Sequence, residues 1–135
     1  MRYHSRTLVG MLAAFAAAVA LAAGPGLATQ KSTERGVTVA VTPKNVASDA
    51  TEWEFAVALD THSGDLSDDL AKSAVLLDAA GERHRALAWK GAPPGGHHRA
   101  GTLTFEPVSP RPQSIELRIE RPGEAAPRTF RWSLQ

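Results

Sequence analysis

Hydrophobic and polar residues alternate along most of this chain with a period of two. The clearest run is residues 114–120, where Ile115, Leu117 and Ile119 alternate with charged side chains. A period of two is typical of a strand that places one face on a core, and no stretch keeps a helical period for more than one turn. The pattern predicts seven strands, at residues 36–42, 53–60, 74–78, 83–89, 101–105, 114–120 and 129–134.

The predicted strands are short, evenly spaced and separated by turn-forming residues. This spacing predicts an all-β fold, an antiparallel β-sandwich of immunoglobulin-like size and strand number, with a small barrel as the alternative. Pro43 is expected to end the first strand, and Asp78-Ala-Ala-Gly81 is typical of a turn. In the long connection at 61–73, the spacing of two leucines predicts one helical turn with Ser67 as its cap.

The first 28 residues have the composition of a secretory signal peptide. A short basic start precedes an uncharged run, residues 8–23, and small residues at 26–28 or 20–22 suit a signal peptidase. The run is short for a membrane span, which needs about 20 strongly apolar residues, so an uncleaved anchor is the alternative. We therefore expect an exported protein, periplasmic or extracellular, with a flexible lead-in at 29–35, one domain at 36–135 and no membrane span in the mature chain.

Charge and cysteine content exclude several classes of function. Of the 15 Lys and Arg residues two lie in the predicted signal peptide, so the mature chain has 13 against 14 Asp and Glu, a formal net charge of 13 − 14 = −1. This balance gives no argument for nucleic acid or an anionic membrane as a partner. The absence of cysteine excludes disulfides, thiolate metal sites and thiol catalysis.

Candidate chemistry concentrates in the connections after the second, fourth and sixth predicted strands, residues 60–73, 90–100 and 121–127. Alternate connections of an antiparallel sandwich lie at the same end, so these three are expected to meet. Loops clustered on a rigid scaffold commonly carry binding function. Their polar residues are His62, His97, His98, Asp60, Asp65, Asp68, Asp69, Arg99 and Glu124.

The histidines and carboxylates of these loops suggest a site for Cu²⁺ or Zn²⁺. His62, with His97 or His98, and with Asp60 or Asp65, would supply the nitrogen and oxygen ligands that these metals accept. Adjacent residues of an extended segment point in opposite directions, so only one of the two neighbouring histidines is expected to share a site with His62. The alternative is that these imidazoles contact loop backbone or solvent.

The acidic loop offers a second candidate, a Ca²⁺ site formed by oxygens of Asp60, Asp65, Asp68 and Asp69. Its spacing differs from the twelve-residue calcium loop, which makes Ca²⁺ the weaker candidate. Asp69 and Arg99 are predicted binding residues, and Arg99 is expected to orient a carboxylate. No motif fixes a nucleophile with an oxyanion hole, so we do not expect an enzyme.

Three segments resemble recurring segments of a family of small exported bacterial β-sandwich proteins of unassigned activity. They are Val41-Thr-Pro-Lys-Asn45, Leu59-Asp-Thr-His-Ser-Gly-Asp-Leu66 and Trp89-Lys-Gly-Ala-Pro-Pro-Gly-Gly-His-His-Arg99. The resemblance spans most of the mature domain. It implies an exported domain of a bacterial envelope, and it implies neither a catalytic residue nor a ligand.

Together these patterns predict an exported, monomeric, non-catalytic binding module with a Cu²⁺ or Zn²⁺ site in its clustered loops. The alternative is a protein-interaction or envelope-assembly domain without a metal, which would use the same loops or an edge strand. The expected partner is accordingly a metal ion or another envelope protein.

Overall fold

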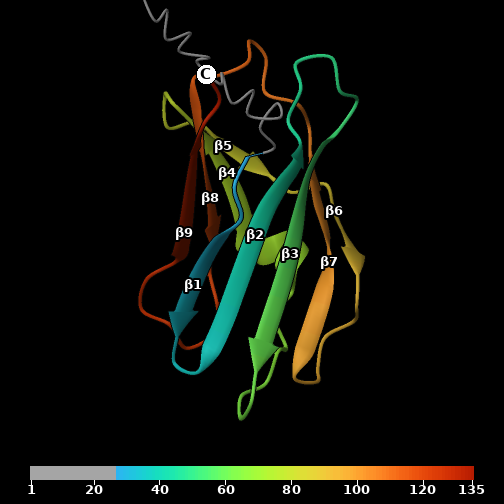
Figure 1. The fold of residues 1–135 in the computed structure, drawn as a ribbon, viewed down its shortest axis with the longest axis vertical. Helices are drawn as coiled ribbons and strands as arrows, with labels where there is room; N and C mark the ends of the chain where they lie inside the picture. Colours follow the sequence, from blue (N-terminus) through green and yellow to red (C-terminus); the bar gives the residue numbers. More distant parts are fainter. Residues whose placement is uncertain (1–26) are drawn as a thin grey trace, which may run out of the picture.

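The computed structural model describes residues 27–135, and the predicted signal peptide lies almost wholly outside this range. The described chain forms two antiparallel sheets that pack against each other (Figure 1). The first sheet has the order β1 (Gln30–Glu34), β2 (Val37–Asn45), β3 (Trp53–Thr61), β7 (His98–Phe105) and β6 (Ala88–Gly91). The second has the order β5 (Arg83–Arg85), β4 (Ala74–Asp78), β8 (Ser114–Ile119) and β9 (Arg128–Ser133), and a single helical turn, α1 (Leu70–Ser73), precedes β4.

The alternating residues that predicted the strands form the core between the two sheets. Every second residue of β2, β3 and β8 is buried, as the period of two requires. Aromatic rings pack within and between the sheets. The ring centroid of Phe55 in β3 lies 5.6 Å from that of Phe105 in the neighbouring strand β7, edge to face, and 5.9 Å from that of Trp132 in β9 of the other sheet. The prediction of an all-β, antiparallel, sandwich-like fold is confirmed.

The number of strands differs from the seven predicted, because the described chain has nine. Residues 30–34, expected within a flexible lead-in, form the edge strand β1 along β2. The predicted strand at 83–89 is two strands in different sheets: β5 pairs with β4, and β6 pairs with β7. The chain crosses between the sheets at Ala86 and Leu87, so residues 83–89 do not form one continuous strand.

Three boundaries also differ from the predicted ones. Pro43 does not end β2, because a register shift between Pro43 and Asn45 accommodates it within the strand. Strand β7 begins at His98 and not at residue 101. The helical turn begins after Asp69, whose side chain accepts a hydrogen bond from the backbone N–H of Lys72, so the cap is Asp69 and not Ser67.

Candidate functional site

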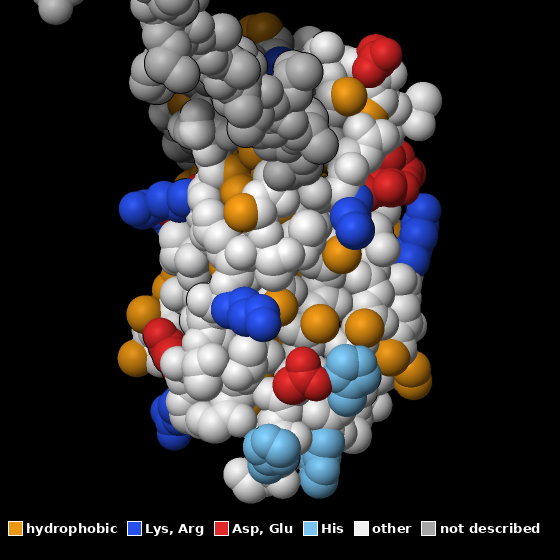
Figure 2. Space-filling model, in the orientation of Figure 1, with side chains coloured by type: hydrophobic (Ala, Val, Ile, Leu, Met, Phe, Trp, Pro, Cys, Tyr) orange, Lys and Arg blue, Asp and Glu red, His pale blue; other side chains and the backbone are white. Residues whose placement is uncertain are grey.

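The three polar loops meet at one end of the sandwich, as predicted. Asp60 pairs with His98 across β3 and β7, and the backbone N–H of Thr61 donates to the carbonyl of His97 at 2.9 Å. The third loop joins them through Arg121, whose side chain reaches Asp68. Figure 2 shows histidine side chains gathered at one end of the molecule. We call this end, formed by residues 60–69, 92–98 and 121–127, the loop pole.

A buried ion pair connects two of these loops below the surface of the loop pole. Arg121 donates from Nε to one carboxylate oxygen of Asp68 at 2.8 Å and from Nη2 to the other at 3.0 Å. The side chains are 6% and 0% exposed. Burial alone would lower the pKa of Arg121, but the hydrogen bonds and charge of Asp68, with those of Glu124, raise it above its ordinary value.

Glu124 extends this ion pair into a chain of charges that reaches the first strand. Its carboxylate accepts from Arg121 Nη1 at 3.0 Å and from Nε and Nη2 of Arg128 at 2.7 and 3.0 Å. Hydrogen bonds from Arg128 lower the pKa of Glu124 more than burial raises it, and Arg121 lowers it further. Arg128 also donates to the carbonyls of Ser32, Glu34 and Val37, so the network anchors β1 and the start of β2.

Arg99 has a different role from the predicted one of orienting a carboxylate. It is 1% exposed, and its guanidinium donates to the carbonyls of Leu66, Asp68 and Ala92. It also lies 5.6 Å from the ring centroid of Trp89, within the range of a cation–π contact. Arg99 therefore holds the backbone of two loops together from below, and within residues 27–135 its hydrogen bonds reach no carboxylate.

The predicted metal ligands lie on the exposed side of the loop pole. His62, His97, Asp65 and Asp69 are exposed, and Nδ1 of His98 hydrogen-bonds a carboxylate oxygen of Asp60, with side chains 65% and 56% exposed. In the described part of the chain, these residues do not form a group of three whose ligand atoms lie within 4.8 Å of one another. The structure thus brings Asp60 and His98 together, while the carboxylate of Asp69 caps α1.

The glycine pair before the neighbouring histidines makes a sharp turn. Gly95 and Gly96 have φ angles of +112° and +74°, which other residues rarely adopt. The backbone N–H of Gly95 donates to the carbonyl of Leu66 at 2.9 Å. This turn directs the chain into β7 and ties the loop that carries His97 to the loop that carries His62.

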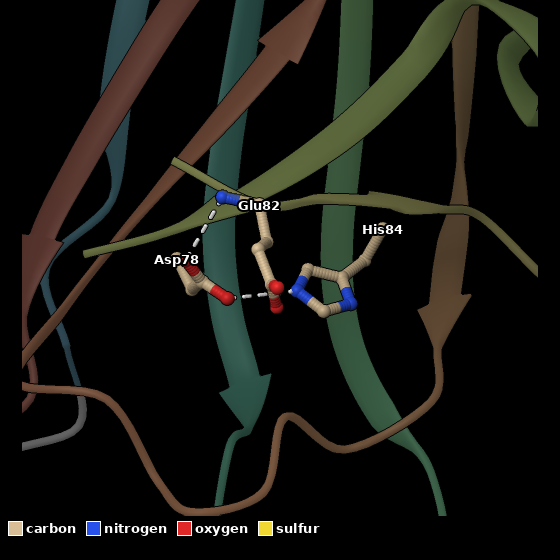
Figure 3. A group of neighbouring side chains, drawn as sticks. All are labelled: Asp78, Glu82 and His84. Atoms are coloured by element: carbon tan, nitrogen blue, oxygen red, sulfur yellow. Dashed lines mark hydrogen bonds and ion pairs between the residues drawn. The ribbon is translucent and has the colours of Figure 1, made fainter. Parts of the chain in front are cut away.

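A second cluster, which the sequence did not suggest, lies on the hairpin between β4 and β5. Asp78, Glu82 and His84 have ligand atoms within 4.8 Å of one another, and within residues 27–135 they are the one group of three that does (Figure 3). Because β4 starts next to α1 and ends at Asp78, this cluster lies at the opposite end of the sandwich from the loop pole. The sequence signal that could have identified this cluster is two acidic residues and a histidine, Asp78, Glu82 and His84, placed on either side of a tight turn.

The hydrogen bonds of Asp78 already give this cluster a structural role. Its Oδ1 accepts from the backbone N–H groups of Ala80 and Glu82 at 2.9 and 3.0 Å, and Nε2 of His84 lies 3.1 Å from Oδ2. The hydrogen bond from His84 is the largest cause of a lowered pKa for Asp78. These contacts close the turn that the sequence predicted, where Gly81 has a φ of +80°.

Comparison with protein-family models, curated proteins and solved structures gives no match for this chain. The resemblance to exported bacterial proteins therefore stays a prediction. Among residues 27–135, no helix has the length and apolar character that crossing a membrane requires.

Proposed function

We propose that this protein is a non-catalytic binding module that holds a divalent transition metal, Cu²⁺ or Zn²⁺, at the loop pole. The observation that carries the proposal is the contact between Asp60 and His98, beside a backbone hydrogen bond from Thr61, the neighbour of His62, to the carbonyl of His97. We propose His62, His98 and His97 as the ligand set, of which His97 and His98 are alternatives for a single position.

The hydrogen bond changes the role proposed for Asp60. Metal-binding histidines commonly donate one ring N–H to a carboxylate, which orients the ring and leaves the other nitrogen for the metal. Asp60 holds Nδ1 of His98, so Nε2 faces away from the carboxylate and is the ligand atom. Asp60 is then the residue that positions the imidazole, and the solvent-exposed Asp65 is the remaining oxygen ligand.

The buried arginine network supports this proposal because a metal site needs ligands on a fixed backbone. Arg99 binds carbonyls in the loop after His62 and in the loop before His97, and Arg121 fixes the first of these loops through Asp68. Each loop is therefore held from the core side, while its histidines remain accessible.

Isothermal titration with Cu²⁺ or Zn²⁺ on metal-free protein tests the proposal. We expect saturable binding that is lost in His62→Ala and in the double variant His97→Ala/His98→Ala. His84→Ala is the matched control, because it removes an imidazole from the hairpin cluster at the other end of the molecule. Loss of binding in His84→Ala alone would place the metal at Asp78 and Glu82, and no saturable binding in the wild type would refute the metal site.

We also propose that the sandwich is immunoglobulin-like, monomeric and exported to the periplasm or cell exterior. The order β1-β2-β3-β7-β6 beside β5-β4-β8-β9 supports the first point, because it corresponds to the arrangement A-B-E-D beside C-F-G with two added edge strands, β1 and β5. Export is supported by the composition of the first 28 residues.

A protein-interaction domain is the second candidate, and one observation favours it. The edge strand β5 carries exposed arginines and pairs with β4 alone among the described strands. An uncovered sheet edge is a site where a partner can add a strand.

A further inference from the structure

The two long sides of the sandwich differ in how their sheet edges are covered. On one side, the edge strands β1 and β9 are joined: Arg128 donates to the carbonyl of Ser32 at 2.8 Å, and the backbone N–H of Arg131 donates to the side chain of Gln30 at 3.0 Å. On the other side lie β5 and β6, each with a single neighbour within residues 27–135. Among the described strands, none pairs with the outer side of β5.

The side chains of β5 make this open edge basic. Arg83 and Arg85 are exposed, and within the described residues their guanidinium groups have no hydrogen bond or ion pair. Arg85 lies opposite Val75 and Arg83 opposite Leu77, so both arginines project from the outer face of the second sheet. Leu77 lies outside the main core cluster, yet it is only 8% exposed. This burial is expected if the long side chains of the outer face cover it.

Positive charge continues across the same outer face. The register places Arg118 beside Val75, Glu116 beside Leu77 and Arg131 beside Glu116. Glu116 is the sole carboxylate in these rows and already hydrogen-bonds both Arg118 and Arg131. With Arg83 and Arg85, these two rows of the face carry four arginines and one glutamate, a formal charge of 4 − 1 = +3. Glu120 follows Arg118 on the same face and lowers the charge of the face to +2. Residues 27–135 as a whole carry −1, so the positive charge is concentrated here.

A hollow lies beside β5. Its volume is about 580 Å³, and its lining includes Arg83, Arg85, Lys72, Ser73 and Glu120. The hydroxyl of Ser73 is buried without a hydrogen-bond partner in residues 27–135.

We propose that the β5 edge is the docking site for an extended segment of a partner protein that carries acidic side chains at alternate positions. An added strand would hydrogen-bond the outer backbone of β5. Side chains two residues apart project from the same face, so carboxylates at positions i and i+2 would lie opposite Arg83 and Arg85.

The charges on β5 argue against a second copy of the chain as the occupant. Antiparallel pairing of two β5 strands about His84 would place Arg83 of one copy opposite Arg85 of the other. Like charges directly opposite each other destabilise a pair of strands. Arginines on an edge also discourage pairing with neutral or basic strands, which gives the site selectivity for acidic ones.

The test is fluorescence anisotropy of the full chain with a labelled nine-residue peptide in which glutamate alternates with valine. We expect saturable binding and slower hydrogen exchange of the β5 amides in the complex. Arg83→Glu/Arg85→Glu should weaken binding about tenfold or more, since each cross-strand charge pair contributes up to about 1 kcal/mol and reversal adds repulsion. Arg83→Gln/Arg85→Gln should give a smaller loss, and circular dichroism checks that both variants fold.

Two controls separate this proposal from general attraction between charges. Lys31→Glu/Lys44→Glu makes the same change in net charge on the first sheet and should leave binding unchanged. A peptide of the same composition with its glutamates in adjacent pairs separated by two valines has no two glutamates at positions i and i+2, so only one carboxylate can lie opposite an arginine. It should bind up to about fivefold more weakly, the loss of one cross-strand charge pair. The proposal would be overturned if both peptides bound equally well, or if the lysine and arginine double variants lost binding equally. It would also be overturned if a sulfated polysaccharide bound more tightly than the peptide without slowing hydrogen exchange in β5, or if the protein dimerised through β5.

Discussion

Arg121 and Asp68, 53 residues apart in the sequence, form a buried two-point ion pair that joins two loops of the loop pole. Parallel hydrogen bonds between a guanidinium and a carboxylate fix orientation as well as distance. Together with Glu124 and Arg128 they place two positive and two negative groups in one connected network. Removal of one member leaves a buried charge without its partner, which costs more than the intact pair contributes.

We expect Asp68→Asn to lower the free energy of unfolding by about 3 kcal/mol, because Arg121 then stays buried beside a neutral amide. Urea unfolding followed by tryptophan fluorescence measures this change. Asp65→Asn is the matched control: its side chain is exposed, and the expected effect is within about 0.5 kcal/mol. Equal effects of the two substitutions would mean that the buried pair has no special role in stability.

The lowered pKa of Glu124 makes stability depend on pH on the acid side. Its pKa is depressed below the ordinary value of 4.5, mainly by Arg128, so the folded state favours the charged carboxylate. The resulting stabilisation is complete above that ordinary value and is lost as the pH falls through the lowered pKa of the folded state. We therefore expect the melting temperature to fall as the pH decreases below about 5.

Glu124→Gln should reduce this acid dependence and should also destabilise the protein at pH 7. Melting curves from pH 3 to pH 7 of the variant and the wild type test both effects. The melting temperature of the variant should still depend on pH to some extent, because other carboxyl groups also have a lowered pKa. One is Glu116, where burial raises the pKa but hydrogen bonds from Arg131 and Arg118 lower it more. Parallel curves for the variant and the wild type would contradict the assignment to Glu124.

The sequence predicted the core well because burial imposes a simple period of two. Alternation in β3 and β8 identified Phe55 and Leu117 as inward-facing, and both are fully buried. The meeting of the loops was also predictable, because reversal of direction at each connection decides which end a loop occupies. Neither inference needed side-chain geometry.

Features that depend on long-range polar contacts could not be read from the pattern. Strand β1 has the sequence Gln-Lys-Ser-Thr-Glu, without an apolar face, and Arg128 and Gln30 fix it from distant positions. Arg99 and Arg121 are buried because backbone carbonyls and Asp68 satisfy them, whereas arginine is ordinarily an exposed residue. The change of sheet after Arg85 follows from packing, since the local sequence would also suit one strand.

The position of β1 predicts slow hydrogen exchange in a segment whose composition suggests disorder. Because β1 pairs with β2 over its whole length and Arg128 binds its carbonyls, the amides of residues 30–34 should exchange more slowly than those of the loop at 121–127. Arg128→Ala should accelerate exchange in β1. Gln30→Ala, which removes a single side chain of this contact, should have a smaller effect in the same direction, and rapid exchange of β1 in the wild type would contradict the strand.

Asp60→Ala distinguishes the positioning role proposed for this residue from that of a metal ligand. Removal of the group that holds a ligating histidine commonly lowers metal affinity about 10- to 100-fold without abolishing binding. We therefore expect Asp60→Ala to weaken Cu²⁺ or Zn²⁺ binding by that factor, whereas the double variant of the neighbouring histidines loses it. Asp60→Asn should weaken binding less than Asp60→Ala, because the amide oxygen can still accept from Nδ1 of His98. If both substitutions at Asp60 leave the affinity unchanged, the carboxylate does not orient the imidazole, and the metal is not held through Nε2 of His98.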